Sequence, residues 1–209
     1  MRTLILANGD APTCELLNDL IESHELFIAT DGGANTAVNL GVTPDIVCGD
    51  FDSIDMETAR AAFPDAEFIP TPDQNMADLE KAIQLAKERG ASSITIVGAS
   101  GGRIDHQLAN HALLLKYADL NESISIRDDL SEVWGVLGEI EIEAVIGDTI
   151  SLIAMERISG VSISGVRWPL SDVPLHLGTL GVSNVAHDRS VRVSVRSGKL
   201  LLCRLRQRT

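Results

Sequence analysis

In the first part of the chain, short apolar runs alternate with longer segments of helical periodicity. Apolar runs typical of β-strands occupy residues 3–7, 26–29, 46–48, 67–69 and 93–97. Helical spacing is clearest at residues 78–89, which Gly90 ends, and at residues 104–117. Strands that alternate with helices predict a mostly parallel sheet with helices on both faces. Ligands of such sheets gather at the carboxyl ends of the strands.

From about Asn121 the pattern changes to short segments rich in Val, Ile and Ser. These segments occupy residues 139–146, 150–154, 161–166, 191–195 and 200–205, and turn-forming Gly and Pro residues separate them. The pattern is typical of an all-β sandwich. We therefore expect an N-terminal, Rossmann-like α/β domain at residues 1–122 and a C-terminal β-sandwich domain at residues 123–209, joined without a flexible linker.

The composition excludes several kinds of protein. No apolar run approaches the roughly 18 residues that a membrane helix needs. The apolar start of the chain is interrupted too soon, at Asn8, to be a signal peptide. Cys14, Cys48 and Cys203 lie far apart and form no CxxC motif, so neither a disulfide framework nor a zinc site is predicted. We expect a protein of the reducing cytoplasm, without membrane contact.

The net charge of −13 is unevenly distributed. Residues 1–120 carry 19 acidic and 7 basic residues, whereas residues 121–209 carry 11 and 10. Nucleic-acid binding needs clustered Lys and Arg, so we expect no nucleic-acid partner. An acidic domain that binds a polyphosphate needs metal ions as intermediaries.

A glycine-rich turn follows the second predicted strand, at Asp31-Gly32-Gly33-Ala34-Asn35. Glycine lets the backbone approach a ligand closely, and the amide groups at the start of the next helix can bind an anion. Asp31, Gly32 and Asn35 are therefore candidate nucleotide-binding residues. The alternative is a turn that merely caps a helix.

Two acidic residues, Asp50 and Asp52, follow the third predicted strand in the segment Gly49-Asp-Phe-Asp-Ser. Residues at i and i+2 lie on one side of the chain where it is extended. Magnesium prefers carboxylate and phosphate oxygens and usually keeps only one or two protein carboxylates. The pair is a candidate magnesium site, and the alternative is a solvated loop in which Ser53 or Asp55 caps the next helix.

Asp78 and Lys81 lie on one face at the start of the helix predicted after the fourth strand. Asp78 is placed where a metal ligand would be expected, and Lys81 could supply positive charge to phosphate oxygens. The alternative is an exposed ion pair without a function.

A second glycine-rich turn, residues 98–106, follows the fifth predicted strand and contains Arg103, Asp105 and His106. Arg103 suits bidentate contact with phosphate. Asp105 could bind metal or accept a proton, and His106 could contact phosphate or ribose, although a capping histidine is an equal alternative. Together, the strand ends predict a nucleoside triphosphate and magnesium held above the sheet.

The motifs and their order resemble the thiamine pyrophosphokinase family over nearly the whole chain. The matching segments are Asp31-Gly-Gly-Ala-Asn, Gly49-Asp-Phe-Asp-Ser, Asp73-Gln through Asp78-Leu-Glu-Lys-Ala, Gly101-Gly-Arg-Ile-Asp-His, Ser164-Gly-Val-Arg-Trp-Pro-Leu and Gly181-Val-Ser-Asn. The resemblance implies an enzyme that transfers the pyrophosphoryl group of ATP to the hydroxyl of thiamine. It also implies a homodimer in which the β-domain of one subunit meets the α/β domain of the other.

The resemblance further implies roles for individual residues. Asp50, Asp52 and Asp78 would hold magnesium. Gln74, Lys81, Arg103 and Asp105 would surround the polyphosphate, and the catalytic residues would be Asp78, Lys81, Arg103 and Asp105. Trp168, Ser183 and Asn184 would form the thiamine pocket. The chain departs from the family pattern at Asn75, where Asp is frequent, and at Ala77, where a Thr hydroxyl could cap the helix.

One physical argument supports thiamine as the substrate. Its thiazolium ring is a cation, and a tryptophan face such as that of Trp168 binds cations well. The alternative is a Trp168 buried in the core of the sandwich.

Other functions stay open at this stage. A pyrophosphokinase for another heterocycle, such as 6-hydroxymethylpterin, would share the metal acids without needing Trp168. A magnesium phosphohydrolase with Asp50 as nucleophile lacks its DxDGT-like signature here, because Ser53 stands at the position of the glycine. A nucleotide-sensing module would bind ATP without producing AMP.

Overall fold

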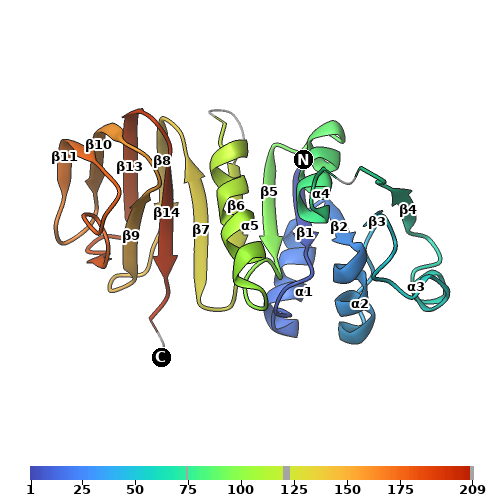
Figure 1. The fold of residues 1–209 in the computed structure, drawn as a ribbon. Helices are drawn as coiled ribbons and strands as arrows, with labels where there is room; N and C mark the ends of the chain where they lie inside the picture. Colours follow the sequence, from blue (N-terminus) through green and yellow to red (C-terminus); the bar gives the residue numbers. More distant parts are fainter. Residues whose placement is uncertain (74, 120–122, 208–209) are drawn as a thin grey trace. The chain divides into compact units, whose positions relative to one another are not determined.

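The computed structural model describes residues 1–73, 75–119 and 123–207 (Figure 1). The chain divides into two compact units. Unit 1 contains Met1–Asn110 and Ile126–Asp129, and unit 2 contains His111–Ser125 and Leu130–Thr209. Residues 120–122, beside the predicted domain boundary, lie outside the described part, and that boundary stays a prediction.

Unit 1 is an α/β structure. Its parallel strands lie in the order β5-β1-β2-β3-β4, with β1 at Arg2–Leu6, β2 at Leu26–Thr30, β3 at Ile46–Gly49, β4 at Glu67–Pro70 and β5 at Ser93–Val97. Between them run α1 at Cys14–Ser23, α2 at Asp31–Leu40, α3 at Met56–Ala62 and α4 at Asp78–Glu88. Helix α5, at Ile104–Tyr117, follows β5, and its residues from His111 onward are assigned to unit 2. The predicted parallel sheet and its helices are confirmed.

Capping side chains explain where several of these helices begin. Thr13 caps α1, Thr30 caps α2 and Asp55 caps α3, and each accepts a hydrogen bond from an amide of the first turn. Of the two residues that the alternative interpretation offered as a helix cap, Ser53 and Asp55, the structure uses Asp55. Ala77 precedes α4 and provides no side-chain cap, as expected from the missing Thr hydroxyl.

Side chains of unit 1 alternate between the two faces of its sheet, as they must in extended strands. Leu4 and Leu6 of β1 join a core with residues of α1, α2 and α3. Ile5 and Ile28, also fully buried, lie outside that core cluster. Helix α4 contacts β1, β2 and β3. Helices therefore cover both faces, which is why the strands are almost continuously apolar.

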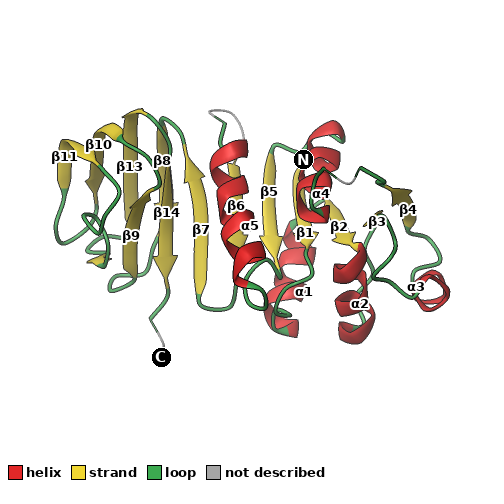
Figure 2. Ribbon diagram, viewed as in Figure 1, coloured by secondary structure: helices red, strands yellow, loops and turns green. Residues whose placement is uncertain are grey.

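Unit 2 is built of antiparallel strands. They are β7 at Ser131–Val136, β8 at Glu139–Glu143, β9 at Thr149–Ala154, β10 at Ile158–Ser164, β11 at Leu170–Leu175, β12 at Asn184–Val185, β13 at Ser190–Ser197 and β14 at Leu200–Leu205. Hydrogen bonds join β12-β9-β14-β7 in this order in one sheet and β11-β10-β13-β8 in the other. Figure 2 draws the labelled strands of both groups in yellow. A further strand, β6, occupies Ser123–Arg127.

A single hydrophobic core joins the two sheets of unit 2. Trp134 of β7, Leu152 of β9 and Leu202 of β14 contribute from one sheet, and Val161 of β10 and Val193 of β13 contribute from the other. Alternate residues of each strand face this core, which is the packing of a sandwich. The predicted combination of an α/β part and an all-β part is confirmed. None of the described helices is both long and apolar enough to cross a membrane.

Candidate active site

A cavity of about 530 Å³ opens at the carboxyl ends of the strands of unit 1. The chain runs from β1 outward to β4 and then returns to place β5 on the other side of β1. Loops after β1 and β5 therefore diverge, and open α/β sheets bind ligands at such a point. The wall includes Asn8 and Gly9 after β1 and Gly98 and Arg103 after β5.

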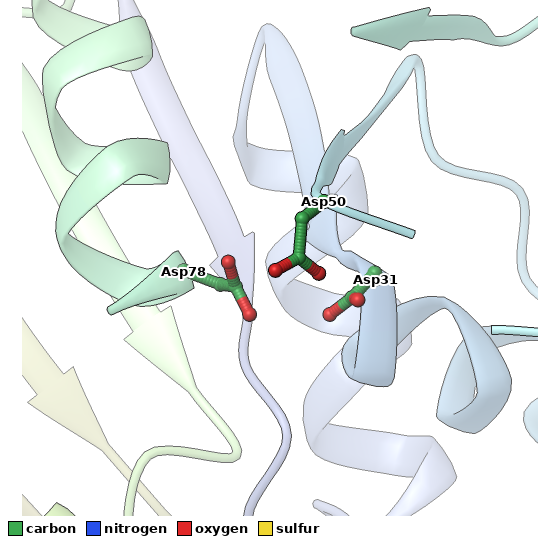
Figure 3. Close-up of side chains that lie close together, drawn as sticks. All are labelled: Asp31, Asp50 and Asp78. Atoms are coloured by element: carbon green, nitrogen blue, oxygen red, sulfur yellow. The ribbon is translucent and has the colours of Figure 1, made fainter. Parts of the chain in front are cut away.

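Three carboxylates converge beside this cavity (Figure 3). One oxygen from each of Asp31, Asp50 and Asp78 lies within 4.8 Å of the others. Asp31 is only 2% exposed. Desolvation, together with the negative charge of Asp78 and Asp50, raises the pKa of the Asp31 carboxyl. Such a group of mutually repelling carboxylates is a suitable site for a divalent cation.

The position of each of these acids is set by the helix or strand next to it. Asp31 is the first residue of α2, Asp50 follows β3, and Asp78 is the first residue of α4. Gly49 makes the approach possible, because a Cβ atom at that position would lie 2.8 Å from the Asp31 Cβ. Parallel strands deliver their following residues to one edge, so residues far apart in sequence meet there.

The predicted partner Asp52 does not join this cluster. Phe51, between the two acids, has φ 63°, so the chain is not extended there and the i, i+2 rule does not apply. Asp52 is exposed and accepts a hydrogen bond from Ser53 Oγ (2.7 Å). The structure thus brings together Asp50 and Asp78 of the predicted set, with Asp31 in place of Asp52.

Lys81 is 6% exposed and lines the cavity. Its Nζ donates to Asp78 Oδ1 at 3.0 Å. This ion pair is therefore not the exposed surface pair considered as an alternative. A buried ammonium group between a carboxylate cluster and a cavity can bind an anion in that cavity.

Arg103 and His106 also line the cavity, and Asp105 lies beside them. Arg103 Nε donates to Asp105 Oδ1 at 3.1 Å, and Arg103 Nη2 donates to Asp105 Oδ2 at 2.5 Å. These bonds are the main reason why the pKa of the Asp105 carboxyl is lowered to about 2. All three side chains are exposed, so the arrangement leaves them accessible to a ligand.

The turn after β2 differs from its predicted role. Gly33 N–H donates to Thr30 Oγ1 (3.1 Å) and Gly32 N–H donates to Asp31 Oδ1 (2.6 Å), so these amides already have partners. A Cβ on Gly32 would lie 2.1 Å from Asn8 Cγ, so this glycine permits protein packing. Asn35 Nδ2 donates to the Ser53 carbonyl (2.7 Å). The helix-capping alternative therefore describes Gly32 and Gly33, and neither Gly32 nor Asn35 lines the cavity.

Unit 2 brings the three predicted thiamine residues together. The backbone N–H of Trp168 donates to Asn184 Oδ1 (3.1 Å), and Asn184 Nδ2 donates to the backbone carbonyl of Trp168 (2.6 Å). Ser183, next to Asn184, has φ 62° and its N–H donates to Ser151 Oγ (3.0 Å). Trp168 is 56% exposed, so the alternative of a tryptophan buried in the sandwich core is wrong for it. The tryptophan buried in that core is Trp134, which is 8% exposed. The Arg167 guanidinium lies 5.5 Å from the centre of a Trp168 ring.

Sequence reasoning missed several residues of the site. Asn8 and Asn110 line the cavity, and Asp31 belongs to the carboxylate cluster rather than only to a turn. The segment Asn8-Gly9-Asp10 follows the first predicted strand, so the rule that ligands gather at strand ends could have found Asn8. Nothing in the sequence around Asn110, seven residues after Arg103 within a helix, marks it. Gln74 lies outside the described residues.

Comparison with known proteins agrees with this architecture. Residues 17–126 match the family model of the thiamin pyrophosphokinase catalytic domain, and residues 139–200 match that of its vitamin B1 binding domain. The chain is 32% identical to a thiamine pyrophosphokinase of Bacillus subtilis, over 98% of this chain and 99% of the relative. It is 27% identical to thiamin pyrophosphokinase 1 of Caenorhabditis elegans, over 73% of this chain and 68% of the relative.

Solved structures show the same similarity. The crystal structure of thiamine pyrophosphokinase from Bacillus subtilis superposes with a TM-score of 0.88 at 28% identity and covers 100% of both chains. That of thiamin pyrophosphokinase from Geobacillus thermodenitrificans gives 0.84 at 28% identity, covering 100% of this chain and 99% of the other. With both family domains matched in order along one chain, this protein belongs to the thiamine pyrophosphokinase family.

Proposed function

We propose that this enzyme transfers the pyrophosphoryl group of ATP to the hydroxyl of thiamine, producing thiamine diphosphate and AMP. The observation that carries the proposal is the cavity of unit 1, which Asp50, Asp78, Lys81 and Arg103 all line. The arrangement combines a carboxylate cluster with cationic side chains, which is the composition that a metal–polyphosphate complex requires. The relatives that match along the whole chain are named for this activity.

The carboxylate cluster fits a divalent cation, for which we propose Mg²⁺. Asp31, Asp50 and Asp78 offer hard oxygen ligands. Burial first, and then the negative charges of Asp78 and Asp50, raise the pKa of the Asp31 carboxyl, and a cation would offset those charges. The bound ion would offset negative charge on the phosphate oxygens of ATP. Asp52 stays a predicted ligand from the sequence, exposed next to the cluster.

Lys81 and Arg103 are proposed to bind and orient the phosphates. Lys81 is held in place by Asp78, so its ammonium group is positioned before ATP arrives. Arg103 is held in place by Asp105 in the same way. An orienting role for Asp105 agrees with its low pKa, because a carboxylate with a pKa of about 2 is a weak base near neutral pH. His106, which lines the cavity, stays a predicted nucleotide contact, as does Gln74. Asp31 is assigned to the metal cluster instead, and the nucleotide contacts of Gly32 and Asn35, which do not line the cavity, stay predictions from the sequence alone.

Trp168, Ser183 and Asn184 are proposed to bind thiamine. Asn184 fixes the backbone of Trp168 by two hydrogen bonds, while the indole stays exposed and can contact a cationic ring. In the reaction, the thiamine hydroxyl oxygen forms a bond to the β-phosphorus of ATP, the bond from that phosphorus to the AMP oxygen breaks, and the hydroxyl proton is released.

We also propose that the active protein is a homodimer with shared sites, located in the cytoplasm. Cys14, Cys48 and Cys203 are all free thiols, which agrees with a reducing compartment.

The dimer can be tested by mixing Trp168→Ala subunits with Asp50→Asn subunits. In a mixed dimer one shared site combines both defects and the other combines neither, so recovery reaches at most about half of wild-type activity. No recovery after demonstrated subunit exchange would mean that each chain builds its own site.

Product analysis tests the proposed reaction directly. The enzyme is incubated with ATP, Mg²⁺ and thiamine, and the nucleotides and thiamine phosphates are separated. We expect equal amounts of AMP and thiamine diphosphate. ADP with thiamine monophosphate would place the cleavage at the wrong phosphorus and reject the proposal. Turnover of 6-hydroxymethylpterin in preference to thiamine, or ATP binding without AMP, would support the corresponding alternatives.

A further inference from the structure

Phe51 has an unusual backbone conformation in the loop that carries Asp50. Three described non-glycine residues have positive φ angles, namely Phe51 at 63°, Asp172 at 53° and Ser183 at 62°. Asp tolerates the left-handed region comparatively well, whereas a bulky residue there is a true outlier. Such strain persists only where the surroundings hold it, and it concentrates at functional sites.

The left-handed turn directs the following amides toward the carboxylate cluster. Asp52 N–H donates to Asp50 Oδ1 at 3.3 Å, and Ser53 N–H donates to Asp31 Oδ2 at 3.4 Å. The Ser53 carbonyl is in turn fixed by Asn35 of α2. Two acids of the cluster are therefore held by the backbone immediately after Phe51. An extended residue at position 51 would point these amides elsewhere.

The side chain of Phe51 supplies the contacts that hold this conformation. Its ring packs against the core cluster of unit 1 and lies 6.3 Å from the ring centre of Phe68 on β4, at 56° to it. Position 51 is therefore subject to two opposite requirements. The backbone favours glycine, whereas the core favours a large apolar side chain.

We propose that Phe51 is a positioning residue that orients Asp50 and Asp31 for the metal through its left-handed backbone. This inference rests on the proposed function, because it assigns the loop to metal binding. In this role Phe51 acts only through the two carboxylates and does not itself bind the metal or the substrates. A purely structural Phe51 would affect stability but not the affinity for a metal ion.

The test is the affinity for Mn²⁺ of the protein alone, measured by the loss of the free-ion electron paramagnetic resonance signal. Phe51→Ala and Phe51→Gly both remove the ring, but only glycine adopts the left-handed region freely. We expect Phe51→Gly to bind within about threefold of wild type. Phe51→Ala should bind about fivefold to tenfold more weakly than Phe51→Gly, which reflects the cost of a left-handed alanine.

Two further variants separate this role from general loss of stability. Phe51→Asn, which tolerates positive φ, should follow the glycine variant. Phe63→Leu alters the same core at a position outside the loop, and should lower the thermal midpoint while leaving Mn²⁺ affinity within about twofold. Circular dichroism confirms that each variant is folded.

The possible failures can be told apart. Equal Mn²⁺ affinities of Phe51→Ala and Phe51→Gly, with wild-type binding intact, would overturn the role of Phe51 alone. Absence of Mn²⁺ binding by the wild-type protein would overturn the metal site and the inference with it. Product analysis of the wild-type enzyme remains an independent test of the reaction.

Discussion

The two units build their proposed sites in different ways. In unit 1, Asp31, Asp50 and Asp78 come from the ends of different strands and the start of different helices, and they meet only in the folded chain. In unit 2, the Asn184 side chain makes two hydrogen bonds with the backbone of Trp168, and the indole of Trp168 stays exposed. Charged groups of like sign need a rigid frame to be held together, whereas an aromatic surface needs only a fixed backbone.

This difference predicts that changes in the two units should separate catalysis from thiamine binding. Unit 1 variants should lose turnover while retaining thiamine affinity. Unit 2 variants should lose thiamine affinity while retaining ATP affinity. The following predictions run from the largest expected effect to the smallest.

The largest effect is expected for Asp50→Asn. Removing one charge from the cluster should lower turnover at least about a hundredfold. Even the mutation of a residue that only hydrogen-bonds to a metal ligand lowers metal affinity or activity about 10- to 100-fold. Steady-state kinetics and thiamine binding by calorimetry provide the measurement. A folded Asp50→Asn enzyme with wild-type turnover would show that the cluster does not serve the reaction.

Trp168→Ala tests the other half of the comparison. Loss of the exposed indole should weaken thiamine binding by about 10- to 30-fold, the equivalent of roughly 1.4–2 kcal/mol. ATP affinity should change by less than about twofold. Calorimetric titration with each substrate separately gives both values. Equal weakening of ATP and thiamine binding would contradict a division of labour between the units.

Asp31→Asn and Asp52→Asn are matched variants that test which third carboxylate binds the metal. The structure places Asp31 beside Asp50 and Asp78, whereas the sequence predicted Asp52. Asp31 lies in the cluster and Asp52 does not. We expect Asp31→Asn to weaken Mn²⁺ binding by the protein alone about tenfold, and Asp52→Asn to leave it within about twofold. A larger loss in Asp52→Asn than in Asp31→Asn would restore the set Asp50, Asp52 and Asp78.

The smallest effect concerns a residue near the site that has only a structural role. Asp55 caps α3 and accepts from the amides of Glu57 and Thr58 at 3.1 and 3.2 Å. Asp55→Ala should lower the thermal midpoint by about 2–4 °C and leave turnover and both substrate affinities unchanged. A drop in turnover comparable to that of Asp50→Asn would mean that Asp55 also belongs to the site.

Much of the fold could be predicted from local pattern. The helix expected at residues 104–117 is α5, Ile104–Tyr117, and the strands expected in the α/β part are all present. Apolar periodicity decides these elements because each must bury one face or both. Helix capping by Asp55 was one of two possibilities that the sequence offered beside Ser53, because a capping side chain acts within three residues of itself.

The composition of the site was only partly predictable. The sequence by itself determined the family, the two kinds of sheet and the strand ends at which acids would gather, because these depend on periodicity and motif order. Only the tertiary structure decided that Asp31 joins Asp50 and Asp78, and that Trp134 rather than Trp168 is buried. The φ angle of Phe51 turns Asp52 out of the cluster. Phe51 itself packs against Phe68 and the core, contacts between residues distant in sequence that no local pattern records.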